Sequence, residues 1–153
     1  MSPTGLKRII LHTDGGSRGN PGPAGYGLVL SDETGAVLAE QGGFIGRATN
    51  NEAEYAGLLA GLEAAGKVGA AELIVKSDSG LLVRQLNGAY RVRSPKLAPL
   101  FAQAQQRLRG FLSWRAEHVR REMNTRADAL ANDAMDRHAA APEAAGDGPS
   151  LPQ

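Results

Sequence analysis

The first part of the chain carries three stretches with the pattern of β-strands. Residues 7–13 ("KRIILHT") form a run of β-branched residues and leucine, and two further apolar stretches occupy residues 24–30 and 36–46. Clusters of glycine, proline and short polar residues separate them, as is typical of strand ends. The links hold no helical pattern and are too short for a parallel crossover, so we predict an antiparallel meander of three strands.

The periodicity changes after the polar stretch at residues 48–51. A pattern of one apolar helix face follows and ends near residues 67–69. The residues on this face are Tyr55, Leu58, Leu59, Leu62 and Ala65. We therefore predict an amphipathic helix directly after the third strand.

The remaining chain alternates between strand and helix patterns. The predicted strands cover residues 72–77 and 111–119, and the predicted helices cover residues 78–88, 95–111 and 124–139. A strand, a helix and a strand joined by short links imply a parallel crossover. The full order, βββαβααβα, predicts an α/β protein with a mixed sheet and helices on its faces.

Length and composition fit one globular domain. The 153 residues suffice to bury a core, and 42% hydrophobic with 22% charged residues is ordinary. The absence of cysteine excludes a disulfide scaffold, a thiolate zinc site and a cysteine nucleophile. We expect the domain to cover residues 1–138, and residues 139–153, which are small, polar and interrupted by proline, to form a flexible tail.

The apolar segments are short. The N-terminus has no long apolar core, and no apolar run reaches about 18 residues. We therefore expect a cytoplasmic protein that does not contact membranes. No further apolar face is left over after the predicted core is assembled, so a monomer is expected.

Basic residues concentrate in the second half of the chain. The net charge is only +1, yet residues 84–126 hold ten Lys or Arg against two acids, Glu117 and Glu122. Such an excess is expected of a surface that contacts phosphates. A solvated helix face has the same composition, and the charge pattern alone does not separate these two interpretations.

Four acids stand where a predicted strand or helix meets a loop. Asp14 ends the first strand, Asp78 ends the fourth, and Glu54 and Asp128 lie in the first turns of helices. Parallel strands place their carboxyl ends at one sheet edge, where α/β proteins carry their sites. Simpler explanations exist for each acid: a turn for Asp14, a helix N-cap for Asp78, and a favourable charge near a helix N-terminus for the other two.

A cluster of carboxylates indicates a metal site. Carboxylates within a few ångströms repel one another and stay ionised only when cations join them. Without cysteine or paired histidines, an all-oxygen site favours Mg²⁺ or Mn²⁺ over zinc. Two such ions about 4 Å apart activate a water and stabilise the leaving oxygen in phosphodiester cleavage.

Four sequence blocks resemble those of type 1 ribonuclease H, in the same order and spacing. They read "TDGGSRGNPGPAGYG", "ATNNEAEYAGLLAGLEAA", "VKSDSGLLVRQLNG" and "NTRADALANDA", and the resemblance runs from Lys7 to Met135. It implies the ribonuclease H-like fold, with a five-stranded mixed sheet of order 3-2-1-4-5, an antiparallel second strand and helices on both faces. Residues 87–111 offer one helix, so the chain resembles the short branch that lacks the basic protrusion.

The resemblance implies an activity and a set of catalytic residues. The family cleaves the RNA strand of RNA–DNA hybrids by endonucleolytic hydrolysis with two metal ions, Mg²⁺ or alternatively Mn²⁺, and leaves 5′-phosphate and 3′-hydroxyl ends. Matched by position, the catalytic and metal-binding acids are Asp14, Glu54, Asp78 and Asp128. Glu52 does not match the pattern and is interpreted as a charge in the first turn of its helix.

The resemblance also implies substrate contacts. The residues that match those near the minor groove of the hybrid are Gly15, Ser17, Asn20, Asn50 and Asn51. Arg47 and Thr49 resemble a pocket for a DNA phosphate. Glycine lets backbone approach a ribose closely, and short polar groups recognise the 2′-hydroxyl that distinguishes RNA from DNA.

Two residues resemble auxiliary catalytic groups. His118 lies ten residues before Asp128, the spacing of a histidine that assists proton transfer or product release in some members. Arg121 matches an arginine of the short branch in the stretch "HVRREMN". Because His118 falls in an alternating strand pattern, we favour Arg121 for this part.

Two other functions are compatible with such a fold. A nuclease or strand-transfer enzyme of the same superfold, integrase-like or junction-resolving, would share the acids. The "TNN" element and the glycine-rich first turn speak against it because they suit ribose recognition. A catalytically silent nucleic-acid-binding domain is disfavoured because clustered negative charge would weaken phosphate binding.

Overall fold

A five-stranded mixed sheet forms the centre of the molecule. The computed structural model describes residues 7–139. The strands are β1 (Arg8–Ser17), β2 (Gly22–Ser31), β3 (Val37–Ala48), β4 (Glu72–Ser77) and β5 (Ser113–His118), in the order β3-β2-β1-β4-β5. β2 is antiparallel to both its neighbours, whereas β4 is parallel to β1 and β5 is parallel to β4. The predicted α/β class and strand order are confirmed.

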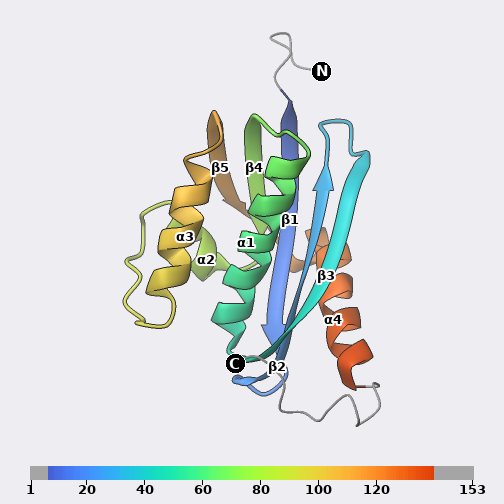
Figure 1. The fold of residues 1–153 in the computed structure, drawn as a ribbon, viewed down its shortest axis with the longest axis vertical. Helices are drawn as coiled ribbons and strands as arrows, with labels where there is room; N and C mark the ends of the chain where they lie inside the picture. Colours follow the sequence, from blue (N-terminus) through green and yellow to red (C-terminus); the bar gives the residue numbers. More distant parts are fainter. Residues whose placement is uncertain (1–6, 140–153) are drawn as a thin grey trace.

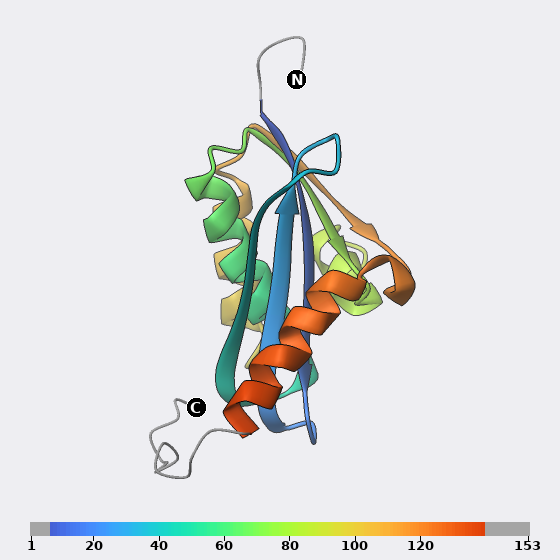
Figure 2. The same cartoon turned by 90° about the vertical axis from the view of Figure 1, so that its right-hand side faces the viewer.

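Helices cover both faces of this sheet. They are α1 (Asn50–Lys67), α2 (Gly80–Leu86), α3 (Ala98–Leu108), the short 3-10 helix η1 (Arg121–Met123) and α4 (Thr125–Ala139). α1 and α3 pack together on one face, and α4 crosses the opposite face over β2 and β3 (Figures 1 and 2). Only one helix lies between α2 and β5, as predicted. None of the helices over residues 7–139 has the length and apolar character to cross a bilayer.

The main core lies between the sheet and the helices α1 to α3. Alternate residues of β1, namely Ile9, Leu11 and Thr13, are fully buried, and Leu11 is paired with Leu30 of β2. From the helices the core receives Leu58, Leu62, Leu82, Leu86, Ala104 and Leu108. This burial of alternate strand residues against one face of each helix is the reason that the sequence periodicity located these elements.

On the other face of the sheet, small residues line the contact with α4 and let the helix lie close to the strands. α4 buries Ala127, Ala131 and Ala134 toward the sheet. A Cβ built on Gly27 of β2 would overlap the carbonyl oxygen of Ala127, and one on Gly25 would lie 3.3 Å from that of Ala131. Backbone therefore meets backbone here, which fixes α4 close to the strand that neighbours β1.

The element ends differ from the predicted ones at several places. β1 runs three residues past Asp14, because its pairing with β2 continues to Ser17 opposite Ala24. Its pairing with β4 stops at Thr13 opposite Ser77. The prediction that Asp14 is the last residue of its strand is therefore wrong. Asp14 is the residue of β1 directly after the last one that pairs with β4.

The helices are shorter than predicted at their ends. α2 spans residues 80–86 rather than 78–88, and α3 spans residues 98–108 rather than 95–111. The Ser79 side chain caps α2 by accepting from the Leu82 N–H, and Pro99 lies in the first turn of α3, where proline is tolerated. α4 includes Ala139, and the rest of the predicted tail lies outside the described residues.

Gly27→Ala should destabilise the fold at the contact between β2 and α4. The added Cβ meets backbone that cannot move aside, so we expect the free energy of unfolding to fall by at least about 2 kcal/mol. Urea denaturation of the purified variants measures this. The matched control is Gly66→Ala in α1, where a Cβ meets nothing within 4 Å and better helix propensity should add about 0.5–1 kcal/mol. Equal stability of the two variants would contradict the packing described.

Candidate active site

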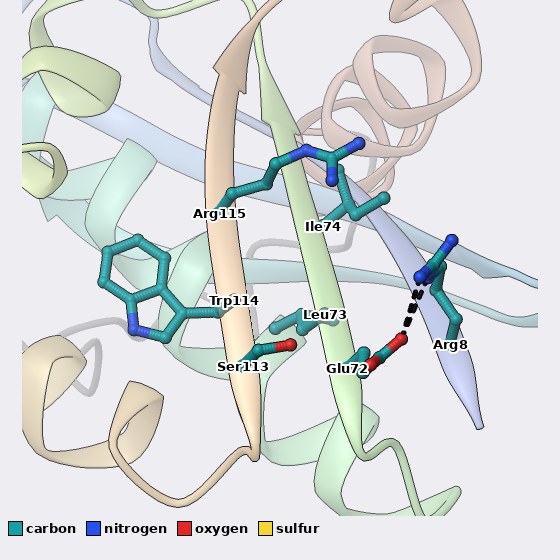
Figure 3. A pocket seen from close by; sticks show the side chains of 7 residues that line it. All are labelled: Arg8, Glu72, Leu73, Ile74, Ser113, Trp114 and Arg115. Carbon is teal, nitrogen blue, oxygen red and sulfur yellow. Dashed lines mark hydrogen bonds and ion pairs between the residues drawn. The ribbon is translucent and has the colours of Figure 1, made fainter. Parts of the chain in front are cut away.

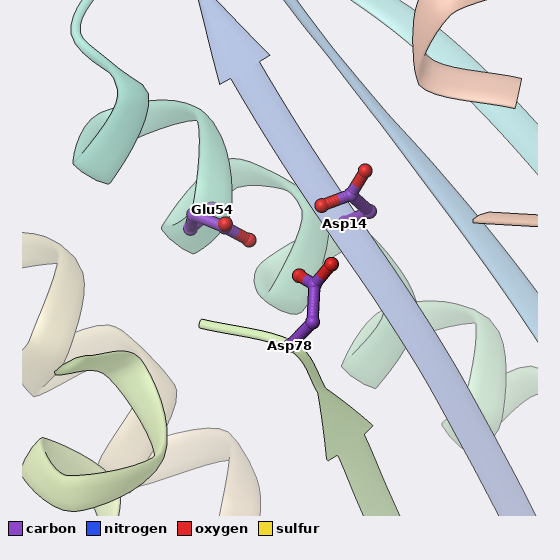
Figure 4. Close-up of side chains that lie close together, drawn as sticks. All are labelled: Asp14, Glu54 and Asp78. Atoms are coloured by element: carbon purple, nitrogen blue, oxygen red, sulfur yellow. The ribbon is translucent and has the colours of Figure 1, made fainter. Parts of the chain in front are cut away.

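Three acids from three elements converge beside β1. Asp14 lies in β1, Glu54 in α1 and Asp78 in the loop after β4, and their side chains point toward one another (Figure 4). One carboxylate oxygen from each lies within 4.8 Å of the others. Only 8% of Asp14 is exposed. This arrangement is a cluster of oxygen ligands of the kind that hard divalent cations bind.

The fourth predicted acid lies next to Asp14. Asp128 is in the first turn of α4, as predicted, and its hydrogen bond and charge both raise the pKa of the Asp14 carboxyl. Within residues 7–139, the group of acids with oxygens inside 4.8 Å of one another does not include Asp128. The four acids thus lie as three clustered carboxylates with a neighbour beside Asp14.

The structure excludes the simpler explanations for three of these acids. Asp14 is in a strand and does not initiate a turn, and the residue that caps α2 is Ser79 rather than Asp78. Glu54 lies beyond the first turn of α1, contrary to the prediction, because the helix begins at Asn50 and its first-turn acid is Glu52. None of these three carboxylates therefore serves a local helix or turn.

Burial and mutual repulsion change the protonation of the cluster. Burial is the largest cause that raises the pKa of Asp14 to about 8, and Asp128 and Asp78 add to it. Burial, followed by the charges of Asp14 and Asp78, raises the pKa of Glu54 to about 9. The Glu54 Oε1 atom is buried and accepts no hydrogen bond from residues 7–139. A cation between these groups would supply the missing partner and the missing positive charge.

Close contact between β1 and α1 brings Glu54 to Asp14. A Cβ on Gly15 would overlap the carbonyl group of Ala53, and the Gly15 N–H makes a hydrogen bond that favours the charged form of Glu54. Only glycine permits this approach. The Gly15 predicted for substrate contact therefore has a structural function in assembling the cluster.

A buried asparagine that the sequence analysis did not single out anchors the start of α4. The Asn124 Nδ2 donates to the main-chain oxygen of Thr13, directly before Asp14, at 2.9 Å. Asn124 is 1% exposed. This bond ties the helix that carries Asp128 to the strand that carries Asp14. In the sequence, an asparagine before a helix only indicates a cap, so no local signal distinguishes this function.

Three of the predicted substrate residues are bonded to one another. The Asn50 Oδ1 accepts from the Ser17 N–H at 2.8 Å, and the Asn20 Oδ1 accepts from the Asn50 N–H at 2.9 Å. These bonds hold the link between β1 and β2 against the N-terminus of α1. Asn51 is exposed in the first turn of the same helix.

Thr49 and Arg47 occupy different surroundings. Thr49 caps α1 in a reciprocal capping box with Glu52, which confirms the interpretation of Glu52 as a helix charge. Arg47 lines a pocket of about 420 Å³ together with Glu52 and Lys96. The pocket joins the end of β3 to the segment before α3, two parts that are far apart in the sequence.

The two predicted auxiliary residues differ in their contacts with the acids. The Arg121 Nε is 3.8 Å from the Asp78 Oδ2, and its charge lowers the pKa of Glu54. His118 is exposed at the end of β5, opposite Ser77. Of the two auxiliary candidates, Arg121 is thus the one that forms an ion pair with an acid of the cluster.

Another pocket lies at the other end of the parallel strands. It has a volume of about 210 Å³ and is lined by residues of β1, β4 and β5 (Figure 3). Arg8 and Glu72 form an ion pair in it at 3.0 Å, which leaves both charges compensated. The pocket holds no group of acids and offers none of the chemistry of the carboxylate cluster.

Residues 12–134 match the reverse transcriptase-like family. The bifunctional protein Rv2228c of Mycobacterium tuberculosis is 52% identical over 141 residues, covering 92% of this chain and 38% of that protein. Ribonuclease HI of Halobacterium salinarum is 48% identical over 129 residues, covering 84% of this chain and 65% of that protein. The chain thus spans less than two thirds of the length of these relatives.

Solved structures that are similar to this chain are also of ribonucleases H. The N-terminal RNase H domain of Rv2228c, solved as a fusion with maltose-binding protein, has a TM-score of 0.85 at 51% identity, covering 87% of this chain and 96% of that one. LC11-RNase H1 in complex with an RNA/DNA hybrid has a TM-score of 0.83 at 42% identity, covering 86% and 99%. With its fold, its acid cluster and these likenesses, the chain belongs to the reverse transcriptase-like family and, within it, to the type 1 ribonucleases H.

Proposed function

We propose that this chain is an endoribonuclease that hydrolyses the RNA strand of RNA–DNA hybrids in a metal-dependent reaction. The observation that carries the proposal is the convergence of Asp14, Glu54 and Asp78, with a buried Glu54 oxygen that accepts no hydrogen bond from the described residues. The 42% identical LC11-RNase H1 was solved with an RNA/DNA hybrid bound. The cleavage products carry 5′-phosphate and 3′-hydroxyl ends.

The four acids hold two Mg²⁺ ions in this proposal, with Mn²⁺ as the alternative. The donor set consists of carboxylate oxygens alone, which suits either ion. When bound, the ions supply an activated water and stabilise the leaving 3′-oxygen. Asp14 occupies the centre of the set, since Asp78 and Asp128 both act on it.

Arg121 serves the reaction by its charge. Its guanidinium lies beside Asp78 and is exposed, so it can reach a phosphate at the cluster while staying in water. His118 lies at the rim of the site, at the end of β5, and is the second candidate for assisting proton transfer or product release.

Recognition of the RNA strand falls to the link after β1 and the start of α1. Asn20 and Asn50 are held by hydrogen bonds through their side-chain oxygens, which fixes the direction of their amide NH₂ groups. With the exposed Asn51 they present short polar groups that suit 2′-hydroxyls in a minor groove. The Ser17 Oγ, by contrast, is buried without a hydrogen-bond partner among residues 7–139. Gly15 holds this segment close to α1.

In this proposal the DNA strand is bound by basic residues at the end of β3 and before α3. Arg47 and Lys96 line one pocket, and Thr49 is not among the residues that line it. A shared phosphate contact of Arg47 and Thr49 stays a prediction from the resemblance. The Thr49 hydroxyl accepts from the Glu52 N–H with one lone pair, so its O–H can still donate to a phosphate oxygen. Arg91 and Arg93 lie just before Lys96 in the chain, and we propose that they add positive charge to this part of the surface. A monomer and a cytoplasmic location stay predictions.

Asp14→Asn should abolish cleavage while leaving hybrid binding intact. The amide keeps the volume of the side chain but removes the charge at the centre of the cluster, so we expect turnover to fall by at least about a thousandfold. Cleavage of a labelled hybrid and fluorescence anisotropy measure the two properties. Asp133→Asn is the matched control, because that acid is on α4, is 57% exposed and pairs with Arg137. Robust cleavage by Asp14→Asn would reject the assignment.

A panel of duplexes should separate this function from its alternatives. We expect cleavage of the RNA strand in RNA–DNA with Mg²⁺ or Mn²⁺, no cleavage of DNA–DNA, and no activity in EDTA. Gel analysis of end-labelled duplexes reads out every case. Cleavage of DNA–DNA would favour another nuclease of the superfold, and no cleavage of any duplex would favour a silent binding domain.

The metal-free protein should lose stability as pH rises from about 5 to about 8. The folded chain keeps protons on Asp14 and Glu54 up to pKa values of about 8 and 9, whereas unfolded carboxyls release theirs near pH 4. Each extra proton in the folded state lowers the free energy of unfolding by about 1.4 kcal/mol per pH unit. Thermal unfolding in EDTA measures this loss. Excess Mg²⁺ should raise Tm more at pH 8 than at pH 5, and a Tm independent of pH in that range would contradict the cluster electrostatics.

A further inference from the structure

Asn132 places a hydrogen-bond donor beside the Asp128 carboxylate. It lies on α4 one turn after Asp128 and is half-buried. Its Nδ2 donates to the Asp128 main-chain oxygen at 3.0 Å and to Asp128 Oδ2 at 3.3 Å. An asparagine that bonded only the main chain of its helix would make the first of these contacts and not the second.

Arg18 fixes the orientation of the Asn132 amide. The Arg18 Nη2 lies 3.3 Å from the Asn132 Oδ1 and 3.5 Å from its main-chain oxygen. The Arg18 Nη1 forms an ion pair with Asp136, one turn further along α4, at 2.7 Å. With its oxygen turned to a guanidinium, the amide must direct its NH₂ group toward Asp128.

Arg18 belongs to the link that carries the proposed RNA contacts. This link joins β1 to β2 over residues 18–21. Asn20 bonds to the N-terminus of α1 through Asn50, while Arg18 bonds to α4. The link is therefore held by α1 on one side and by α4 on the other. Arg18 is the residue that contacts α4, the helix that carries Asp128.

We propose that Asn132 is a positioning residue for Asp128 and that Arg18 keeps its amide in place. This inference rests on the function proposed above, in which Asp128 is a metal ligand. Asp128 lies outside the tight group of three acids and beside Asp14. A donor on its Oδ2 holds one oxygen and leaves the other for a cation. Outer partners that orient ligating carboxylates in this way have large effects on metal affinity.

The test compares Asn132→Ala and Arg18→Ala with Arg137→Ala. Arg137 is an exposed arginine on the same helix whose partner is Asp133. Isothermal titration calorimetry with Mn²⁺ in the absence of nucleic acid measures metal binding, and hybrid cleavage across a Mg²⁺ series gives kcat and KM. Urea denaturation reports whether each variant is folded.

We expect Asn132→Ala to weaken Mn²⁺ binding about tenfold and to raise the Mg²⁺ requirement of cleavage by a similar factor. The KM for the hybrid should stay within about twofold at saturating Mg²⁺, because Asn132 lies behind the ligand. Arg18→Ala should give a smaller loss of Mn²⁺ affinity, and Arg137→Ala should give none. Since Arg18 is an exposed residue, its variant tests the same point if Asn132→Ala fails to fold.

Unchanged Mn²⁺ affinity in folded Asn132→Ala, or an equal loss in Arg137→Ala, would overturn the inference. Weaker Mn²⁺ binding by Asn132→Ala in a protein that cleaves no hybrid would support the positioning and reject the proposed function. A wild-type protein that binds no Mn²⁺ would overturn both.

Discussion

Repulsion between carboxylates is the constraint on which this structure depends. The fold holds oxygens of Asp14, Glu54 and Asp78 within 4.8 Å of one another in partly buried surroundings. Both burial and repulsion oppose the charges of Asp14 and Glu54. Backbone contacts between β1 and α1, and a buried amide between β1 and the start of α4, resist that repulsion. A protein that folds around such a cluster is less stable than it would be without it, and it regains stability by binding a cation.

Residues 13–17 of β1 make most of the contacts that hold the acid cluster together. The Thr13 carbonyl receives the anchor of α4, Asp14 supplies the central acid, Gly15 admits α1, and Ser17 bonds to the helix N-terminus through Asn50. Alternate side chains of a strand point to opposite faces, so successive residues reach helices on both sides of the sheet. The acid cluster and the proposed substrate contacts are therefore held by one segment of β1.

The sequence predicted most of the fold because its elements bury alternating or helical faces. The bounds of β4 were predicted correctly, since a buried run between turn residues is a strong local signal. The extension of β1 was missed because "GGS" has no apolar alternation, and its strand conformation comes from pairing with β2. The clustering of Asp14, Glu54 and Asp78 agrees with the prediction, although Asp14 does not end its strand and Glu54 lies beyond the first turn of α1. Asn124 and Arg18 were not identified from the sequence, because each acts on a residue more than 100 positions away.

The bond between Asn124 and Thr13 also has a consequence for the order in which the site is completed during translation. It joins residues 111 positions apart, and α4 is the last element of the described chain. A growing polypeptide folds from its N-terminus, so the sheet and α1 can form while α4 is still unsynthesised or inside the ribosome. Until then β1 lacks its anchor and the fourth acid is missing. The acid cluster is thus completed only after α4 has left the ribosome.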